Sequence, residues 1–273
     1  MSTDPVPVTD RGGRRPVALL VRAAGTNCGA ELARAFRLAG AAPTVVHLDR
    51  LLRDPGPIAG AEIIAFPGGF SFGDDIASGR VFAMHVRTAL GGPLREAVGR
   101  GARVLGVCNG FQILVQSGLL PGWDGQERAA ALVENEQGRF IDRWVRVEYP
   151  SASRCVWTKG LAKDQDPETQ LLPIANGEGR FVADDDGLAR LERAGQIAVR
   201  YAEPTNGSAG DVAGICDPTG RVLGLMPHPE RYLDWNRHPF WTSLPSAVRS
   251  GTTPGLRLFE NAVRAEPAAL TQG

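Results

Sequence analysis

The sequence predicts an α/β fold with a central, mostly parallel sheet, on the basis of three observations. Short apolar runs alternate with amphipathic stretches from residue 16 onward, which is the pattern of βαβ units. The apolar run at 103–107 is short enough to be a strand buried on both faces, as strands of parallel sheets are. Beyond residue 121 the pattern changes to alternating apolar and polar residues, which predicts added strands.

The first half of the chain carries the predicted parallel strands and the helices between them. Aliphatic and β-branched runs predict the strands, and apolar residues at helical spacing predict the helices. The first helix is expected to stop at Gly40, because a glycine after a periodic stretch ends a helix. In chain order we predict a strand at 16–22, a helix at 29–39, strands at 43–48 and 62–66, a helical segment at about 75–99, a strand at 103–107 and an apolar helix at 111–120.

The second half of the chain is richer in strand signals. Its segments alternate apolar and polar residues and are separated by turn residues. We therefore expect strands that extend the sheet, followed by a closing helix with apolar residues on one side. The predicted strands lie at 139–149, 171–176, 180–184, 196–201, 211–217 and 221–226, and the helix lies at 255–265.

A single domain is expected at 16–265, because no linker in this range is long enough to separate two independent units. Residues 1–15 are polar and contain proline, which predicts a disordered leader, and residues 266–273 form a short tail. The leader has no apolar segment of the kind found in secretory signals.

The composition argues against several classes of protein. Thirty Lys and Arg residues balance 30 Asp and Glu residues, so the chain has no excess of positive charge for binding a nucleic-acid backbone. The apolar runs are far shorter than the roughly 20 residues that a membrane helix needs. The four cysteines are widely spaced without a C-x-x-C pair, so we expect no metal site and no disulfide framework, and a cytoplasmic location.

Gly106, Cys108 and Gly110 form the strongest chemical signal in the chain, between the strand at 103–107 and the following helix. A nucleophile with a glycine two positions away on each side has the form of a nucleophile elbow, here with Cys in place of Ser. The sharp turn leaves room only for small neighbours. We expect Cys108 to face a ligand at the carboxyl edge of the sheet, with the helix N-terminus favouring its thiolate. The alternative is a buried structural cysteine beside a glycine turn.

A nucleophilic cysteine needs a base, and His228 and Glu230 supply a base and a carboxylate in the segment PHPE. Proline on both sides of His228 predicts an extended backbone, in which residues two apart face the same side. Glu230 would then orient the imidazole while His228 takes the proton from Cys108. The alternative is an exposed loop histidine with an ordinary surface carboxylate.

The glycine pair in PGGF at 67–70 follows the predicted strand at 62–66. Glycines at a strand end can turn backbone N–H groups toward a ligand, and acyl transfer needs such donors for its oxyanion. We expect Gly69 to supply one donor and Asn109, the residue after the nucleophile, to supply the other. Cys28 begins a predicted helix, but nothing in the sequence ties a histidine and a carboxylate to it, so no role is expected.

Together these segments resemble the class I glutamine amidotransferases. The general resemblance rests on three motifs that carry the elbow, the glycine loop and the histidine. A narrower resemblance, to the glutaminase subunits of phosphoribosylformylglycinamidine synthase, rests on three others and covers about residues 16–265. The first three are GVCNGFQ at 106–112, PGGFSFGD at 67–74 and MPHPER at 226–231, and the others are GTNC at 25–28, NGEGRF at 176–181 and the segment 206–215.

The resemblance implies a flavodoxin-like domain that hydrolyses glutamine to glutamate and ammonia through a cysteine thioester. Cys108, His228 and Glu230 would be the triad, Gly69 and Asn109 the oxyanion donors, and Gln112 a contact to glutamine. The chain itself would need no cofactor. A separate synthetase subunit would use ATP and magnesium to convert formylglycinamide ribonucleotide to formylglycinamidine ribonucleotide, in de novo purine biosynthesis.

Three positions depart from the family pattern. Ala24 stands where a proline usually precedes the glycine, and Asn176 stands where a histidine usually precedes GEG. Residues 234–254 are longer than in the small stand-alone subunits and resemble the single-chain form of the enzyme. That length favours a large synthetase as partner, with a small third subunit as the other arrangement.

Two other activities fit the same residues. One is a class I glutaminase that feeds a different acceptor pathway, and the other is a cysteine hydrolase of the same fold that acts on another amide. A binding subunit that has lost the chemistry is a third reading, which the presence of Cys108, His228 and Glu230 disfavours.

Overall fold

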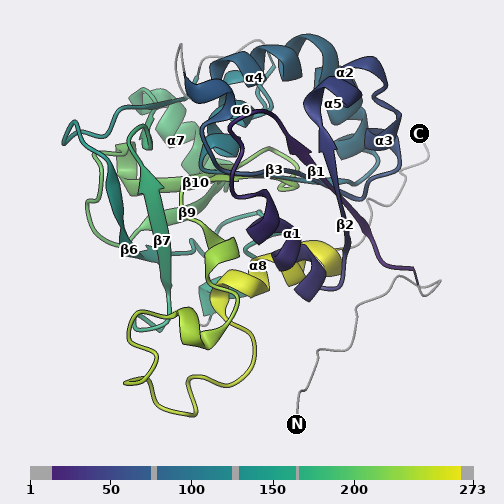
Figure 1. Cartoon of the computed structure of the whole chain (residues 1–273). Coiled ribbons are helices and arrows are strands. Elements are labelled where there is room, and N and C mark those ends of the chain that lie inside the picture. Colours follow the sequence, from purple (N-terminus) through teal and green to yellow (C-terminus); the bar gives the residue numbers. More distant parts are fainter. Residues whose placement is uncertain (1–13, 75–78, 125–128, 164–165, 266–273) are drawn as a thin grey trace.

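The computed structural model describes residues 14–74, 79–124, 129–163 and 166–265 (Figure 1). The expected leader up to residue 13 and the expected tail from residue 266 lie outside these described residues. Among the helices in the described ranges, none is both long and apolar enough to cross a membrane.

Five parallel strands form the part of the sheet that positions the site. They lie in the order β2-β1-β3-β4-β11, which is the 2-1-3-4-5 order of flavodoxin-like folds. Each residue of β3 and β4 is buried, as expected for parallel strands covered on both faces. The carboxyl ends of all five therefore meet at one edge. The bounds are β1 Val17–Arg22, β2 Ala42–His47, β3 Ile63–Phe66, β4 Arg103–Val107 and β11 Val222–Leu225.

The strands of the second half extend this sheet in antiparallel fashion. Within the described residues the sheet has nine strands, and β10, β9, β6 and β7 follow β11 in that order. A separate two-stranded sheet pairs β5 with β8. The alternating segments thus form the added strands that the sequence predicts, whereas β5 was not predicted. Their bounds are β5 Ala131–Val133, β6 Ile141–Glu148, β7 Leu171–Asn176, β8 Arg180–Val182, β9 Ile197–Tyr201 and β10 Val212–Cys216.

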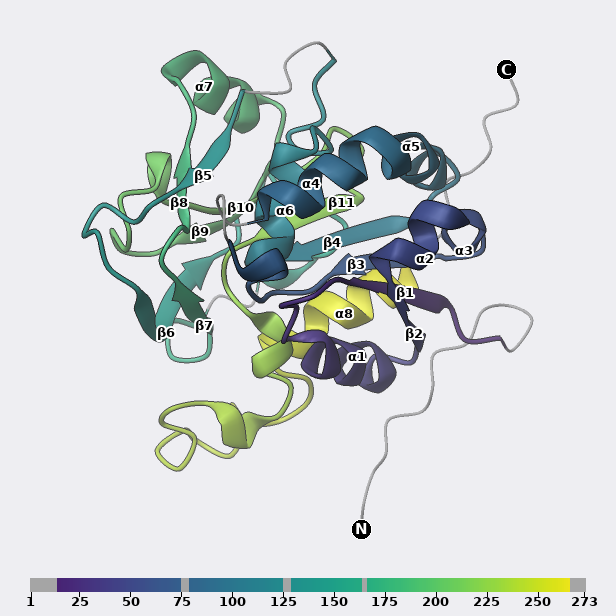
Figure 2. The ribbon, with the colours of Figure 1, turned by 45° about the horizontal axis from the view of Figure 1, so that its top comes forward.

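Helices cover both faces of the parallel strands (Figures 1 and 2). On one face, α1 (Gly29–Leu38) lies beside α8 (Pro254–Arg264), and the rings of Phe36 and Phe259 meet edge to face at 5.1 Å between centroids. The other face carries α2 (Leu48–Arg53), α3 (Gly56–Ala59), α4 (Arg80–His85), α5 (Gly91–Gly99) and α6 (Asn109–Gln116).

Several helices differ from the sequence-based expectation. The segment expected as one helix at 75–99 has its first residues, 75–78, outside the described ranges, and a π-helical turn at Val86–Leu90 separates α4 from α5. Helix α6 ends at Gln116, four residues before the predicted end. The helices α2, α3 and α7 (Asp185–Arg193) were not predicted, because short elements depend on tertiary packing more than on local pattern. Short 3₁₀ turns lie at Ser71–Asp74, Leu161–Lys163, Ala209–Asp211, Pro229–Arg231 and Trp235–Arg237.

Candidate active site

Cys108 lies at the turn between β4 and α6 with φ 53° and ψ −109°. A positive φ is uncommon for a residue with a side chain and is characteristic of strained turns at functional sites. The turn packs tightly, because a Cβ on Gly110 would lie 1.9 Å from the Phe66 carbonyl oxygen. A Cβ on Gly106 would lie 2.5 Å from the Gly110 carbonyl oxygen. Only glycine fits at these two positions, so the flanking glycines let the strand turn and present the thiol.

His228 and Glu230 meet in the loop after β11. The Nδ1 atom of His228 lies 2.6 Å from Oε1 of Glu230, and the two side chains are 2% and 1% exposed. The backbone N–H of His228 donates to the Pro173 carbonyl at 2.8 Å, which anchors the loop to β7. The expected extended backbone is wrong here, because Pro229–Arg231 forms a 3₁₀ turn. Pro229 begins that turn, because its ring fixes φ at a value that suits a helical turn. The turn brings the side chains of His228 and Glu230 into contact.

The surroundings of His228 favour its charged form. Burial alone would lower the pKa of His228, but the Glu230 carboxylate and the neighbouring Cys108 and Cys28 thiols outweigh burial and hold this pKa well above its ordinary value of 6.5. The Nε2 atom of His228 is buried and has no hydrogen-bond partner among the described residues.

Cys108 and His228 line one pocket at the carboxyl edge of the parallel strands. Gly69 follows β3 with φ 143° and lines the same pocket. The N–H groups of Gly69 and Asn109 donate no hydrogen bond to any other described residue. Both are therefore free to donate to a ligand atom. The structure thus brings Cys108, His228 and Gly69 to one pocket, and Asn109 follows Cys108 in the chain without lining that pocket.

The loop before α1 holds the glycine loop in position. The N–H of Phe70 donates to the Gly25 carbonyl at 3.0 Å, and the N–H of Cys28 donates to the Gly68 carbonyl at 3.2 Å. A Cβ on Gly25 would lie 1.9 Å from the Phe70 carbonyl oxygen, so the two loops approach backbone to backbone. The GTNC segment at 25–28, one motif of the narrower resemblance, is thus part of the site.

Gln112 lines the pocket, but hydrogen bonds within the protein already hold its side-chain amide. Its Nε2 donates to the Glu178 carbonyl at 2.6 Å, and its Oε1 accepts from Asn109 Nδ2 at 2.9 Å. Asn109 in turn accepts from the Ser71 hydroxyl at 2.6 Å. Gln112 therefore links the elbow helix to the segment at 176–181. In that segment, Asn176 lines the pocket and is 4% exposed. Neither polar atom of its side-chain amide has a hydrogen-bond partner among the described residues.

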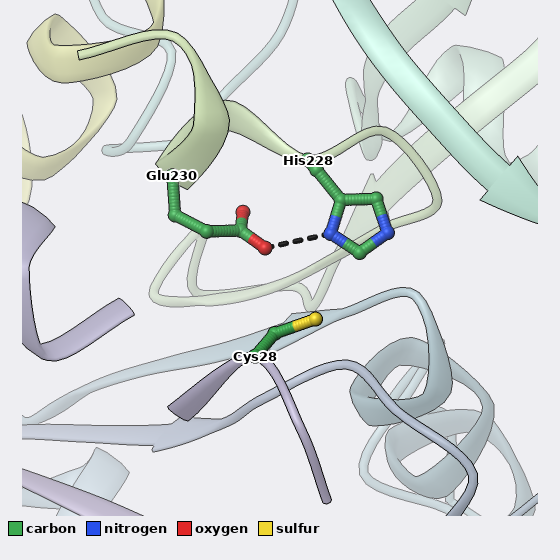
Figure 3. Close-up of side chains that lie close together, drawn as sticks. All are labelled: Cys28, His228 and Glu230. Carbon is green, nitrogen blue, oxygen red and sulfur yellow. Dashed lines mark hydrogen bonds and ion pairs between the residues drawn. The ribbon is translucent and has the colours of Figure 1, made fainter. Parts of the chain in front are cut away.

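Cys28 lies beside the histidine pair, which the sequence did not predict. Its Sγ, a ring nitrogen of His228 and a carboxylate oxygen of Glu230 all lie within 4.8 Å of one another (Figure 3). Arg231 Nη2 donates to Cys28 Sγ at 3.3 Å. A signal was present in the sequence, because Cys28 follows β1 and the ends of parallel strands share one edge. Among the described residues, this cluster is the group with ligand atoms placed to hold a metal ion.

The arrangement is suited to acyl transfer, and comparisons with known proteins agree. Residues 15–264 match the model of the CobB/CobQ-like glutamine amidotransferase domain. A phosphoribosylformylglycinamidine synthase subunit PurQ from Dehalococcoides mccartyi is 39% identical over 255 residues, covering 90% of this chain and 96% of that protein. Another, from Methanococcus maripaludis strain C5, is 42% identical, covering 80% of this chain and 84% of that protein. In a solved structure of PurLQS from Thermotoga maritima, one chain is similar with TM-score 0.68 and 32% identity, over 91% of this chain and 98% of that one.

Proposed function

This chain belongs to the PurQ family of class I glutamine amidotransferases, the glutaminase subunits of phosphoribosylformylglycinamidine synthase, and we propose that Cys108, His228 and Glu230 carry out its chemistry. The reaction of the family hydrolyses glutamine and supplies its amide nitrogen to purine biosynthesis. The observation that carries the residue assignment is the buried His228–Glu230 pair, 2.6 Å apart, whose His228 lines the same pocket as the strained Cys108.

In the first step, Cys108 Sγ attacks the side-chain amide carbon of glutamine as a thiolate. A C–S bond forms and an electron pair moves onto the amide oxygen. The N–H groups of Gly69 and Asn109 stabilise that oxyanion, because they have no other acceptor in the described structure. Gln112 positions Asn109 through its 2.9 Å hydrogen bond. The second hydrogen of its side-chain amide nitrogen is then available to donate to the substrate.

In the second step, the imidazolium of His228 protonates the amide nitrogen. The C–N bond breaks, ammonia leaves and a glutamyl thioester remains on Cys108. Water then gives a proton to His228 and attacks the thioester, which releases glutamate and restores the thiolate and imidazolium. Glu230 holds the His228 ring through Nδ1 in both steps.

The ammonia has an acceptor on another chain in this proposal. We propose as partners a synthetase subunit and a small third subunit, as the name PurLQS of the similar Thermotoga complex supports. The synthetase would use ATP and magnesium to convert formylglycinamide ribonucleotide to the amidine. We place the chain in the cytoplasm, and its four free cysteines support a reducing compartment.

The test combines this chain with its candidate synthetase, ATP, magnesium and formylglycinamide ribonucleotide, and compares glutamine with ammonium as nitrogen donor. Glutamine should support amidine formation only when this chain is present, and ammonium should support it without this chain. Glutamate release without amidine formation would contradict the proposed acceptor, formylglycinamide ribonucleotide, but would support the glutaminase activity. If neither glutamate nor amidine appears, a hydrolase of another amide replaces the proposal.

A further inference from the structure

Cys28 adds a third ligand-forming side chain to the pair formed by His228 and Glu230. The three side chains are buried, and their ligand atoms lie within 4.8 Å of one another (Figure 3). His228 Nε2 and Glu230 Oε2 have no hydrogen-bond partner among the described residues. Metal binding at His228 would release the ring proton and free a nitrogen lone pair, and Glu230 Oε2 already has free lone pairs.

We propose that this cluster binds a zinc ion and that bound zinc inhibits the glutaminase. One thiolate, one imidazole and one carboxylate form a donor set that zinc accepts, with bond lengths of about 2.0–2.3 Å. Tetrahedral bonds of that length place the ligand atoms about 3.5 Å apart. The ligand atoms now lie within 4.8 Å of one another, and His228 Nδ1 and Glu230 Oε1 are 2.6 Å apart, so rotations of these side chains are needed to reach that spacing. The glutaminase steps proposed above involve no zinc.

The position of Gly68 shows how closely the cluster approaches the nucleophile. A Cβ on Gly68 would lie 3.0 Å from His228 Cε1, 3.3 Å from Cys28 Sγ and 3.4 Å from Cys108 Cβ. The three side chains therefore surround one point that only a glycine leaves open. A zinc ion on Cys28 and His228 lies next to Cys108, and the fourth ligand position is open to water, as in zinc sites with three protein ligands.

Zinc would inhibit the reaction because it occupies the lone pairs that His228 and Glu230 need for proton transfer. A lone pair of the imidazole that binds zinc cannot accept a proton, and a zinc-bound Glu230 no longer orients the ring. His228 then can neither protonate the leaving amide nitrogen nor take a proton from the attacking water. This part of the inference rests on the proposed function, whereas zinc binding itself does not.

Arg231 competes with the metal for Cys28. Its Nη2 donates to Cys28 Sγ at 3.3 Å, and its Nε lies 3.5 Å from Glu31 Oε2. The side chain is 33% exposed and can turn toward solvent. Replacing Arg231 with glutamine removes a positive charge next to the metal, so this variant should bind zinc more tightly than the wild type.

Binding is measured on the full chain by dialysis against zinc and by the thiolate-to-metal charge-transfer absorption of cobalt(II) as a probe. The wild type should bind one equivalent with that absorption. Cys28→Ser should lose the absorption and bind zinc about 100-fold more weakly, because a hydroxyl is a poor ligand for this metal. The matched control, Cys108→Ser, should retain both. Unchanged binding in Cys28→Ser, loss of the absorption only in Cys108→Ser, or weaker binding in Arg231→Gln would overturn the site.

Two further measurements test zinc binding without any variant and test inhibition separately from binding. In the wild-type chain, zinc should protect Cys28 from alkylation, as read by mass spectrometry, and a chelator should remove the protection. Unprotected Cys28 at saturating zinc overturns the site without any variant. Glutamate release should fall with zinc in the wild type and require about 100-fold more zinc in Cys28→Ser. If zinc binds at Cys28 without slowing glutamate release, inhibition is wrong and the binding site stands.

Discussion

Replacing Glu230 with glutamine removes the negative charge next to His228 and keeps the size of the side chain. The variant leaves an amide oxygen in place of the carboxylate oxygen that lies 2.6 Å from Nδ1. Burial of His228 is unchanged, but the carboxylate that raises the pKa of His228 against that burial is gone. The imidazolium should therefore lose its proton at a lower pH than in the wild type.

The expected loss of kcat/KM in Glu230→Gln follows from the weakened hydrogen bond between residue 230 and His228 Nδ1. A hydrogen bond to a charged group contributes about 1.5–3 kcal/mol, which corresponds to roughly 10- to 150-fold in kcat/KM. Removing the base altogether in His228→Ala should cost more, about 100- to 10,000-fold. The orienting carboxylate thus contributes less than the base.

The assay is glutamate release in the presence of the synthetase partner, measured across pH for the wild type and both variants. The alkaline limb of the kcat/KM profile should move to lower pH in Glu230→Gln, because His228 must be protonated when ammonia leaves. Equal losses in the two variants, or an alkaline limb that does not move, would refute the role given to Glu230. Circular dichroism spectra of the variants control for folding.

Three other perturbations test the site and the fold. Cys108→Ala should abolish glutamine-dependent amidine formation and leave ammonium-dependent formation by the partner intact; loss of both would assign Cys108 to assembly or structure. Gly110→Ala should lower the free energy of unfolding by about 1–3 kcal/mol in urea titrations, because its Cβ would lie 1.9 Å from the Phe66 carbonyl oxygen, whereas Gly29→Ala, whose Cβ meets nothing within 4 Å, should not. Because the pKa of folded His228 lies above 6.5, its contribution to stability should be complete below that pH and should decline as pH rises through the folded-state pKa. Unfolding free energies of the wild type and His228→Gln at several pH values measure this difference, and a difference that grows with pH would contradict it.

The strands were the best-predicted elements of the fold. The runs at 103–107 and 171–176 match β4 and β7 residue for residue, because apolar and alternating patterns report directly on burial of a strand's faces. The short helix α7 was missed, although Asp184 caps it by accepting from the Gly187 N–H at 2.7 Å. Such a cap is visible in sequence only when the helix that follows is already expected.

The local chemistry of the site was also readable from the sequence. The glycines around Cys108 and the spacing of His228 and Glu230 are short-range features, and each constrains the backbone within a few residues. The backbone conformation that brings His228 and Glu230 into contact could not be predicted in the same way. Proline predicted an extended segment, but packing against β7 holds a 3₁₀ turn instead.

The sequence by itself determined most of the strands, the elbow turn and the candidate side chains of the site, because these depend on neighbouring residues. Only the tertiary structure decided which distant segments share a site. Cys28 and His228 are 200 positions apart in the chain, and they meet because β1 and β11 end at the same edge of one parallel sheet. Strand order is set by how the whole set of apolar faces is buried, and no local pattern contains that information.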